Sequence, residues 1–507
     1  MTPIFPPNAR LPPYSTGAPN TDDKSSAQPH QRHLTFFEVH RGFPSAQTLI
    51  LGSLAEICLE LRVHQAPHSF AIRGIRYIPT PRITKAQTPG FVAPTPPTRT
   101  MESLFSASIE PKTAAIVATT VVATLSFLSL ARLGLYPNWG TAIPNPLKTK
   151  IPTLASDEVK KLPYHPDYFP GARDVDTPVR YHPFAPAHHH LLKMRVPYGS
   201  IRVYEWGSTT GPKVVLIHGI STSCMTLGPI AHALAARGCR VMLFDLFGRG
   251  FSDGVGDLPH DTRLYTTQVL LALASSPLAW SGTDAVRVVG YSLGGAVAAS
   301  FAASFPHVVK SLVLLAPAGL IRAENFGVLA QVTFQSGLVP ERILAAVTRK
   351  RLQKPLASKR SNAVEEDEDP LEKVVDVAAA EVSGPHGGSG DDQKVERKVR
   401  EYVPWMVAHH EGFVKAFMSC VRWAPLTGQH ETWRVLEQRK KGTTAVFIGK
   451  TDEVIDVEHY AKDGLPLLGG DENVTWKVLP GGHDFVMTKT EYIMRELDVF
   501  WGMKVQS

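Results

Sequence analysis

Short apolar runs alternate with stretches of helical periodicity through the second half of the chain. The runs lie at residues 214–217, 241–244, 286–289, 312–315 and 445–448. Strands that are apolar throughout are buried on both faces, and strands that alternate with helices form parallel sheets. The pattern therefore predicts an α/β domain over about residues 181–507, built on a doubly wound, mostly parallel sheet.

Between about residues 320 and 439 the pattern changes to two aromatic-rich stretches of helical periodicity, which predict a helical cap. Inside this interval, residues 359–398 are highly charged, Gly-rich and almost without aromatic side chains. Such a segment buries too little apolar surface to offset its ordering entropy. We therefore expect a disordered acidic insertion within the cap.

The N-terminal part of the chain has a different texture. Residues 1–100 are rich in Pro, Thr, Ser and Gln, and we expect them to be disordered because they carry few apolar side chains. Met101 follows directly, so a natural chain that starts at Met101 is one interpretation. Residues 140–180 are expected to form a linker to the folded domain.

Residues 113–131 form an uncharged, largely apolar stretch between Lys112 and Arg132. A helix of about 20 apolar residues spans the hydrocarbon core of a bilayer. We expect a single transmembrane anchor here, the alternative being a core or interfacial helix. A faint excess of basic residues on its C-terminal side favours a cytosolic position for the domain that follows.

Composition and charge argue against some classes of binding partner. The 507 residues carry a formal net charge of +7, but no block of five or six Lys or Arg, so we expect no nucleic-acid partner. The four cysteines are widely spaced and form neither a disulfide framework nor metal-ligand pairs. We expect no metal and no cofactor.

The stretch Gly290-Tyr291-Ser292-Leu293-Gly294 lies where an apolar run changes into a helix of small residues. The pattern G-x-S-x-G at a strand-to-helix junction makes a sharp turn that lifts the serine hydroxyl above the carboxyl edge of the sheet. Glycine on both sides relieves the crowding that such a turn creates. Ser292 is therefore the candidate nucleophile.

A serine hydroxyl is a weak nucleophile and needs a histidine base that is oriented by an acid. In this type of sheet the acid and then the histidine follow the serine, each after a later strand. Asp452 and His483 occupy those positions, and with Ser292 they form the candidate catalytic triad. The competing acids nearby are Glu453, Asp456 and Asp484.

Backbone amides are the expected donors to the oxyanion of an acyl-transfer intermediate. One is the amide of Leu293, directly after the nucleophile. The other belongs to the loop that follows residues 214–217, where Ile220 is favoured and Ser221 is close behind. His218 in the same loop is expected to order the loop through hydrogen bonds rather than to act as a second base.

The segments VVLIHG, FDLFGRGFSD and GYSLGG, followed late in the chain by GGH, resemble the α/β-hydrolase superfamily in their order. Within it, the chain is similar to membrane-anchored monoacylglycerol lipases and esterases, with meta-cleavage carbon-carbon hydrolases as near relatives. The interval from Ser292 to Asp452 is longer than is usual in such proteins, and the charged insertion accounts for the excess.

The resemblance implies a serine hydrolase that cleaves a lipid-like acyl ester at a membrane. A carbon-carbon bond hydrolase or thioesterase with the same triad is an alternative, and so is a non-catalytic scaffold with this fold. The presence of Ser292, Asp452 and His483 together argues against the scaffold.

Overall fold

The computed structural model describes residues 118–126, 142–181, 195–283, 285–322, 334, 339–353, 381 and 391–503. The chain divides into two units, Met1–Ser103 and Leu104–Ser507, and all described residues belong to the second. The expectations of disorder over residues 1–100 and of a natural start at Met101 therefore lie outside the described residues.

Part of the expected membrane anchor is described. Of residues 113–131, positions 118–126 form an exposed helix that includes Val121, Val122 and Leu125. The other positions of the expected anchor lie outside the described residues. Within the described ranges, no helix combines the length and the apolar character needed to cross a membrane.

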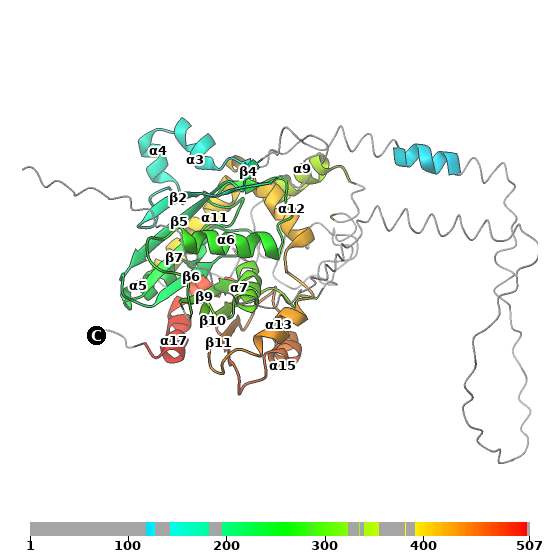
Figure 1. The fold of residues 1–507 in the computed structure, drawn as a ribbon. Coiled ribbons are helices and arrows are strands. Elements are labelled where there is room, and N and C mark those ends of the chain that lie inside the picture. Colours follow the sequence, from blue (N-terminus) through cyan, green and yellow to red (C-terminus); the bar gives the residue numbers. More distant parts are fainter. Residues whose placement is uncertain are drawn as a thin grey trace, which may run out of the picture. The chain divides into compact units, whose positions relative to one another are not determined.

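An eight-stranded sheet forms the centre of the second unit (Figure 1), in the order β12-β11-β10-β9-β6-β7-β5-β2. Its strands are β2 (Ala172–Asp176), β5 (Ser200–Gly207), β6 (Lys213–Ile217), β7 (Arg240–Phe244), β9 (Val286–Tyr291), β10 (Val309–Leu315), β11 (Thr444–Gly449) and β12 (Thr475–Leu479). Neighbours from β12 to β7 run parallel, whereas β5 is antiparallel to both β7 and β2. The prediction of an α/β fold with a mostly parallel sheet is confirmed.

Four helices flank this sheet: α5 (Gly228–Ala236), α6 (Thr262–Ala274), α7 (Leu293–Ser304) and α17 (Thr490–Trp501). The connection from β6 to β7 runs one way along the sheet, and the connection from β7 to β9 runs back past β6. Because parallel crossovers are right-handed, this reversal places α5 on one face and α6 and α7 on the other. The contacts agree, since α17 packs on α5 and α6 packs on α7. The carboxyl ends of β6 and β9 meet at the reversal, where sheets of this kind bind ligands.

The core explains why these runs form strands and why α7 is so rich in small residues. The side chains of Val214, Val215, Leu216 and Ile217 in β6 have no exposed surface, because helices cover both faces of the strand. Helix α7 is buried on all sides over most of its length, from Leu293 to Ala302. Alanine and glycine let it lie close to β9 and β10, which it contacts directly.

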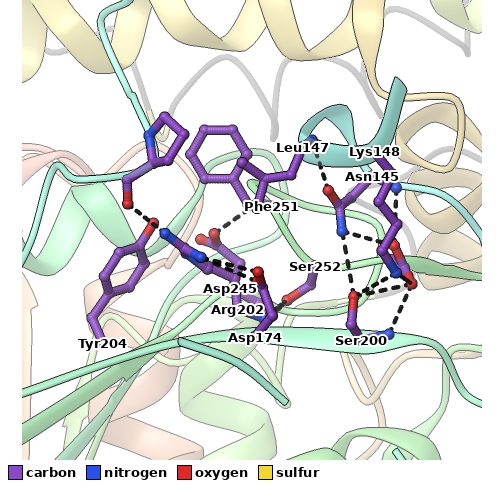
Figure 2. A network of polar contacts seen from close by, with 12 residues as sticks. Asn145, Leu147, Lys148, Asp174, Ser200, Arg202, Tyr204, Asp245, Phe251 and Ser252 are labelled. Atoms are coloured by element: carbon purple, nitrogen blue, oxygen red, sulfur yellow. Dashed lines mark hydrogen bonds and ion pairs between the residues drawn. The ribbon is translucent and has the colours of Figure 1, made fainter. Parts of the chain in front are cut away.

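Residues 142–180, the described part of the segment 140–180 that was expected to be a linker, instead belong to the folded domain. Strand β2 is the last strand of the central sheet and pairs with β5. Upstream of it, Lys148 Nζ lies 2.6 Å from Asp253 Oδ2 and 2.9 Å from Ser200 Oγ, and Asn145 donates to Asp253 Oδ1 at 2.8 Å (Figure 2). These polar contacts act together with isolated buried side chains such as Tyr164 and Phe169, and because neither follows a regular apolar period the sequence resembles a linker.

A second group of contacts fastens the same segment. The buried Tyr164 hydroxyl donates to Asp245 Oδ2 at 3.0 Å and accepts from the Tyr204 hydroxyl at 2.8 Å. Arg202 bonds both Asp174 carboxylate oxygens at 3.2 Å and the Pro166 carbonyl at 2.6 Å (Figure 2). The domain therefore begins well before residue 181.

The helices that lie between β10 and β11 along the chain form the cap. They are α9 (Glu341–Leu352), α11 (Asp391–His409), α12 (Phe413–Trp423) and α13 (His430–Leu436). Helix α11 starts inside the interval 359–398 that we expected to be disordered, and its buried Val399, Val403 and Met406 share one helical face. Glu381, in the same interval, has no exposed surface. The other residues of 359–390 lie outside the described residues.

The remaining elements are short. Two small sheets pair β1 (Ala142–Ile143) with β8 (Gly254–Val255), and β3 (Val179–Tyr181) with β4 (Arg195–Pro197). The helical turns are α3 (Pro146–Thr149), η2 (Ile151–Thr153), α4 (Ser156–Lys161), η3 (Cys224–Leu227), α14 (Val457–His459), η5 (Tyr460–Gly464), α15 (Leu465–Leu467) and α16 (Phe485–Thr488).

Candidate active site

Ser292 occupies a strained turn between β9 and α7. Its backbone has φ 53° and ψ −122°, a conformation that is rare for a residue with a side chain. A Cβ at Gly290 would overlap the Gly294 carbonyl, and a Cβ at Gly294 would overlap the Ile217 carbonyl. Only glycine fits at both positions, so the sequence pattern and the turn have the same cause.

The structure brings together the three residues of the candidate triad. His483 Nε2 lies 3.1 Å from Ser292 Oγ, and His483 Nδ1 lies 3.0 and 2.9 Å from the two oxygens of Asp452. Since a carboxylate only accepts, Nδ1 carries the proton and Nε2 accepts from the serine hydroxyl. This is the tautomer that a general base needs.

Asp452, and none of the competing acids, orients the histidine ring. Its side chain is fully buried, and its Oδ1 also accepts the amides of Val454 at 2.9 Å and Ile455 at 2.7 Å. Asp456 accepts the His459 amide at 3.0 Å, as a helix N-cap. The bonds to Val454 and Ile455 hold the Asp452 carboxylate in place against the histidine ring.

The charges around His483 favour its protonated form. Burial lowers the pKa of the imidazole, but the adjacent Asp452 carboxylate outweighs that effect, and Glu381 and Glu453 add to it, so the pKa is raised overall. The same charge pair stabilises the imidazolium that forms when the ring accepts a proton.

Glu453 and Asp484 lie beside the histidine without touching its ring nitrogens. Glu453 Oε2 accepts the His483 backbone amide at 3.2 Å. Asp484 is almost completely buried, and its Oδ2 has no hydrogen-bond partner among the described residues. Burial, together with the carboxylates of Glu396 and Glu453, raises the pKa of Asp484 to about 7.

The loop after β6 presents its amides at the reversal point of the sheet. The Ile220 amide donates to Glu381 Oε1 at 2.7 Å, and the Ser221 amide donates to Glu381 Oε2 at 2.9 Å. The Leu293 amide is the first of α7, and α-helix geometry leaves such an amide without an intrahelical acceptor. The Ile220 amide, which we predicted to be an oxyanion donor, thus already binds a carboxylate oxygen of Glu381.

His218 orders this loop, as its sequence context predicts. Its Nε2 accepts the Leu246 amide at 2.9 Å, so Nδ1 carries the proton and donates to the Gly219 carbonyl at 2.9 Å. Burial, with the nearby Arg249 cation, lowers the pKa of His218 to about 3. A neutral ring that bonds backbone on both sides is a structural group.

Sequence reasoning missed two charged residues that shape the loop. The buried Arg249 donates through Nε to the Ile220 carbonyl at 3.0 Å and through Nη1 to the Phe247 carbonyl at 3.1 Å. Its position in GRGFSD gives no sign of that contact, because the motif suggests only a glycine-rich turn. Glu381 comes from an interval that the high charge and glycine content marked as disordered, and no motif in the sequence connects it with the site.

The described residues offer no metal site. They contain no group of three or more His, Cys, Asp or Glu side chains arranged to hold a metal ion.

Comparison with known sequences gives a partial match. Residues 210–379 match the family model described as serine aminopeptidase, S33. A serine hydrolase-like protein of Mus musculus is 30% identical over 128 residues, which cover 25% of this chain and 39% of that protein. An uncharacterized protein of Mycobacterium tuberculosis is 31% identical over 134 residues, covering 26% of this chain and 37% of that protein. The chain thus spans about two fifths of the length of these relatives.

Solved structures with a similar fold include a putative lipase from Acinetobacter baumannii, at TM-score 0.42 and 19% identity over 60% of this chain and 87% of that one. Another is a meta-cleavage product hydrolase from Pseudomonas fluorescens, at TM-score 0.39 and 18% identity over 60% of this chain and 95% of that one. The family match covers both the loop after β6 and the turn that carries Ser292, and the sheet is mostly parallel, as predicted. The chain thus has the α/β-hydrolase fold, and residues 210–379 are similar to the serine aminopeptidase S33 family.

Proposed function

We propose that this protein is a serine hydrolase that cleaves an acyl ester through a covalent acyl-enzyme. The observation that carries the proposal is the hydrogen-bonded chain from Ser292 Oγ through His483 to Asp452, at 3.1 and 2.9 Å. It is built at a strained turn whose conformation costs on the order of 1–3 kcal/mol, a feature that clusters at active sites.

The proposed reaction begins when Ser292 Oγ attacks the acyl carbon and His483 Nε2 takes its proton. Asp452 stabilises the resulting imidazolium, and the amides of Ile220 and Leu293 bind the oxyanion of the tetrahedral intermediate. His483 then donates its proton to the leaving alcohol, which departs and leaves the acyl group on Ser292. A water molecule, activated in turn by His483, hydrolyses that ester and releases the acid.

A lipid-like acyl group is the proposed substrate class. The cap reaches the loop after β7, where the Gly250 amide lies 3.2 Å from Met406 Sδ and a Cβ at Gly248 would overlap the Ala416 side chain. The same two cap helices carry buried apolar side chains, among them Met406 in α11 and Phe413 and Phe417 in α12. Apolar surroundings of this kind favour an apolar acyl chain over a charged one.

A fluorophosphonate probe tests the catalytic proposal, because it reacts only with an activated serine. Labelling of the wild type that is lost in Ser292→Ala is the expected result. His483→Ala should lose nearly all hydrolysis, on the order of a thousandfold or more, and the double variant should be scarcely worse, since the triad acts as a unit. Equal labelling of wild type and Ser292→Ala would contradict the proposal.

The scissile bond is tested by comparing three substrate series on the purified enzyme. We expect p-nitrophenyl esters to be hydrolysed faster than matched thioesters and vinylogous diketones. A preference for the diketones would instead identify a carbon-carbon hydrolase, in which the same residues Ser292, Asp452 and His483 would act.

A single-pass membrane location, with the domain in the cytosol, is a separate part of the proposal. It is supported by the apolar sequence of residues 113–131 and by the exposed valines of helix 118–126. The native protein should remain with membranes after an alkaline carbonate wash. Protease added to sealed vesicles that keep the cytosolic side outward should digest the domain, and release by the wash would argue against the anchor.

A further inference from the structure

Glu381 is the residue whose position the proposed reaction does not explain. It is completely buried, and both of its carboxylate oxygens are bound by the loop after β6. The Ile220 amide donates to Oε1 at 2.7 Å, while the Ser221 amide and hydroxyl donate to Oε2 at 2.9 and 2.6 Å. Three short donors to one carboxylate make an anion site, and here the anion belongs to the chain itself.

The loop has the shape of a cradle for this group. The nearest atoms that a Cβ at Gly219 would meet are all in the Glu381 carboxyl, and Oε1 would overlap it. The carboxylate therefore lies directly against the backbone, at a place that a side chain at Gly219 would fill. Arg249 Nε holds the Ile220 carbonyl at 3.0 Å from behind, which fixes the peptide next to the cradle.

The loop donors, rather than a salt bridge, balance the charge of Glu381. Among the described residues, no Lys, Arg or His lies within ion-pair distance of its carboxylate, although Arg249 is close enough to be affected by its charge. Removing an ionised group from water is costly unless hydrogen bonds replace the solvent. The contact is thus specific to this loop and would be expensive to leave unmade.

An oxyanion and the Glu381 carboxylate cannot use this loop at the same time. Each needs the Ile220 amide, and two negative oxygens at one donor would repel each other. The same argument excludes Glu381, in this position, as a group that assists the attack on the acyl carbon. We propose that the Glu381 carboxylate is an internal occupant of the oxyanion site, which holds the enzyme in a self-inhibited state until the carboxylate is displaced by an acyl substrate.

This inference rests on the proposed serine hydrolase function, and its first test uses the same chemistry. The rate constant for fluorophosphonate labelling of Ser292 is measured in the full chain for wild type, Glu381→Ala and Glu381→Gln. A charge-assisted bond contributes enough to change an equilibrium about tenfold to a hundredfold. We expect Glu381→Ala to label faster by that order and Glu381→Gln to fall between it and the wild type.

Glu401 provides a matched control on the exposed side of α11. Glu401→Ala should label at the wild-type rate, which shows that removing an acid from the cap is not by itself activating. Labelling of Glu381→Ala at the wild-type rate or more slowly, with wild type still active, would overturn the self-inhibition and leave the hydrolase function intact.

A second measurement does not depend on activity. Hydrogen exchange of the peptide that contains Ile220 and Ser221 should be faster in Glu381→Ala than in wild type, because both amides lose their acceptor. Unchanged exchange there would overturn the inference whatever the labelling shows. Faster exchange with no labelling of either protein would support the occupied site and count against the hydrolase function instead.

Discussion

The Tyr291 hydroxyl donates a hydrogen bond to the backbone carbonyl of His483 at 2.9 Å. Tyr291 directly precedes the nucleophile Ser292, and through this bond it positions the base His483, which lies 192 residues later in the chain. The two rings are also close, with centroids 5.2 Å apart. The strand that positions Ser292 thus also positions its partner, so that the two reacting groups move together.

Tyr291→Phe tests this coupling. It removes one buried hydrogen bond, which typically contributes about 1 kcal/mol, and leaves the packing of the ring unchanged. We expect kcat to fall by about fivefold with KM nearly constant, because the base is less well oriented while the cap helices proposed to bind the acyl group are unchanged. Steady-state kinetics on a short ester measure both parameters.

Tyr492→Phe, a half-buried tyrosine on α17, is the matched control and should leave kcat at the wild-type value. A rise in KM with unchanged kcat in Tyr291→Phe would mean that the hydroxyl supports substrate binding rather than the base.

The raised pKa of His483 predicts the pH dependence of the reaction. The base works only when neutral, so activity rises with pH as the ring loses its proton. Burial alone would lower this pKa, but Asp452, Glu381 and Glu453 outweigh it. The acid limb of the kcat/KM profile should therefore lie above about 6.5, the ordinary value for histidine. Glu453→Gln removes one of these charges and should move the limb to lower pH.

Asp484 also titrates close to neutrality, with a pKa raised to about 7 by burial and by neighbouring carboxylates. The pH profile of kcat/KM should therefore also be measured in Asp484→Asn. If the acid limb is due to His483, it persists in this variant. Loss of the limb in that variant would assign it to Asp484 and contradict the prediction.

The raised pKa of Asp484 also predicts that the stability of the folded protein depends on pH. The pKa of Asp484 is higher in the folded protein than the ordinary value near 3.9, so the folded state binds this proton more tightly than the unfolded state. Ionisation therefore reduces the free energy of unfolding as pH rises from about 4 to about 7. Asp484→Asn should be more stable than wild type at pH 8, on the order of 1–2 kcal/mol, and the gain should shrink toward pH 5.

Urea unfolding between pH 5 and pH 8 measures this difference. Asp471→Asn, at an exposed turn, should show no pH-dependent change relative to wild type. A gain of equal size at every pH would mean that the substitution acts through packing and not through the charge of Asp484.

The strands and the triad residues could be predicted from the sequence for the same reason. Each triad residue follows a strand of the parallel part of the sheet, and the order of those strands fixes where their carboxyl ends meet. For this reason Ser292, Asp452 and His483 could be named from the sequence before the structure placed them together. The glycines on either side of Ser292 could also be interpreted, because their reason is local.

The unpredicted parts depend on polar contacts between distant positions. Glu381 bonds a loop 160 residues earlier, and no period or motif marks such a pair. The segment before residue 181 was expected to be a linker because it lacks apolar periodicity. In fact Lys148 attaches it to Asp253 (Figure 2), and Tyr164 attaches it to Asp245. A carboxylate that serves as a buried acceptor cannot be told from a solvated one in the sequence.

Tyr164→Phe measures how far the domain depends on that N-terminal segment. The hydroxyl donates to the fully buried Asp245 at 3.0 Å, and the other acceptor bonds of this carboxylate come from the amides of Cys224 and Phe251, both at 2.9 Å. Loss of the Tyr164 donor leaves a buried charge incompletely paired, which costs about 1–3 kcal/mol. We expect that decrease in the free energy of unfolding, measured in urea.

The control is Tyr168→Phe, because Tyr168 is half-buried in the same segment and packs edge-on against Tyr164. Tyr168→Phe should unfold like the wild type.

Truncation of the chain gives a stronger test of the same dependence. A chain that starts at residue 142 should fold and be labelled by fluorophosphonate. A chain that starts at residue 182 should not fold, because it lacks β2 and both polar attachments. A folded, active protein from residue 182 onward would show that the segment only covers a domain that is complete without it.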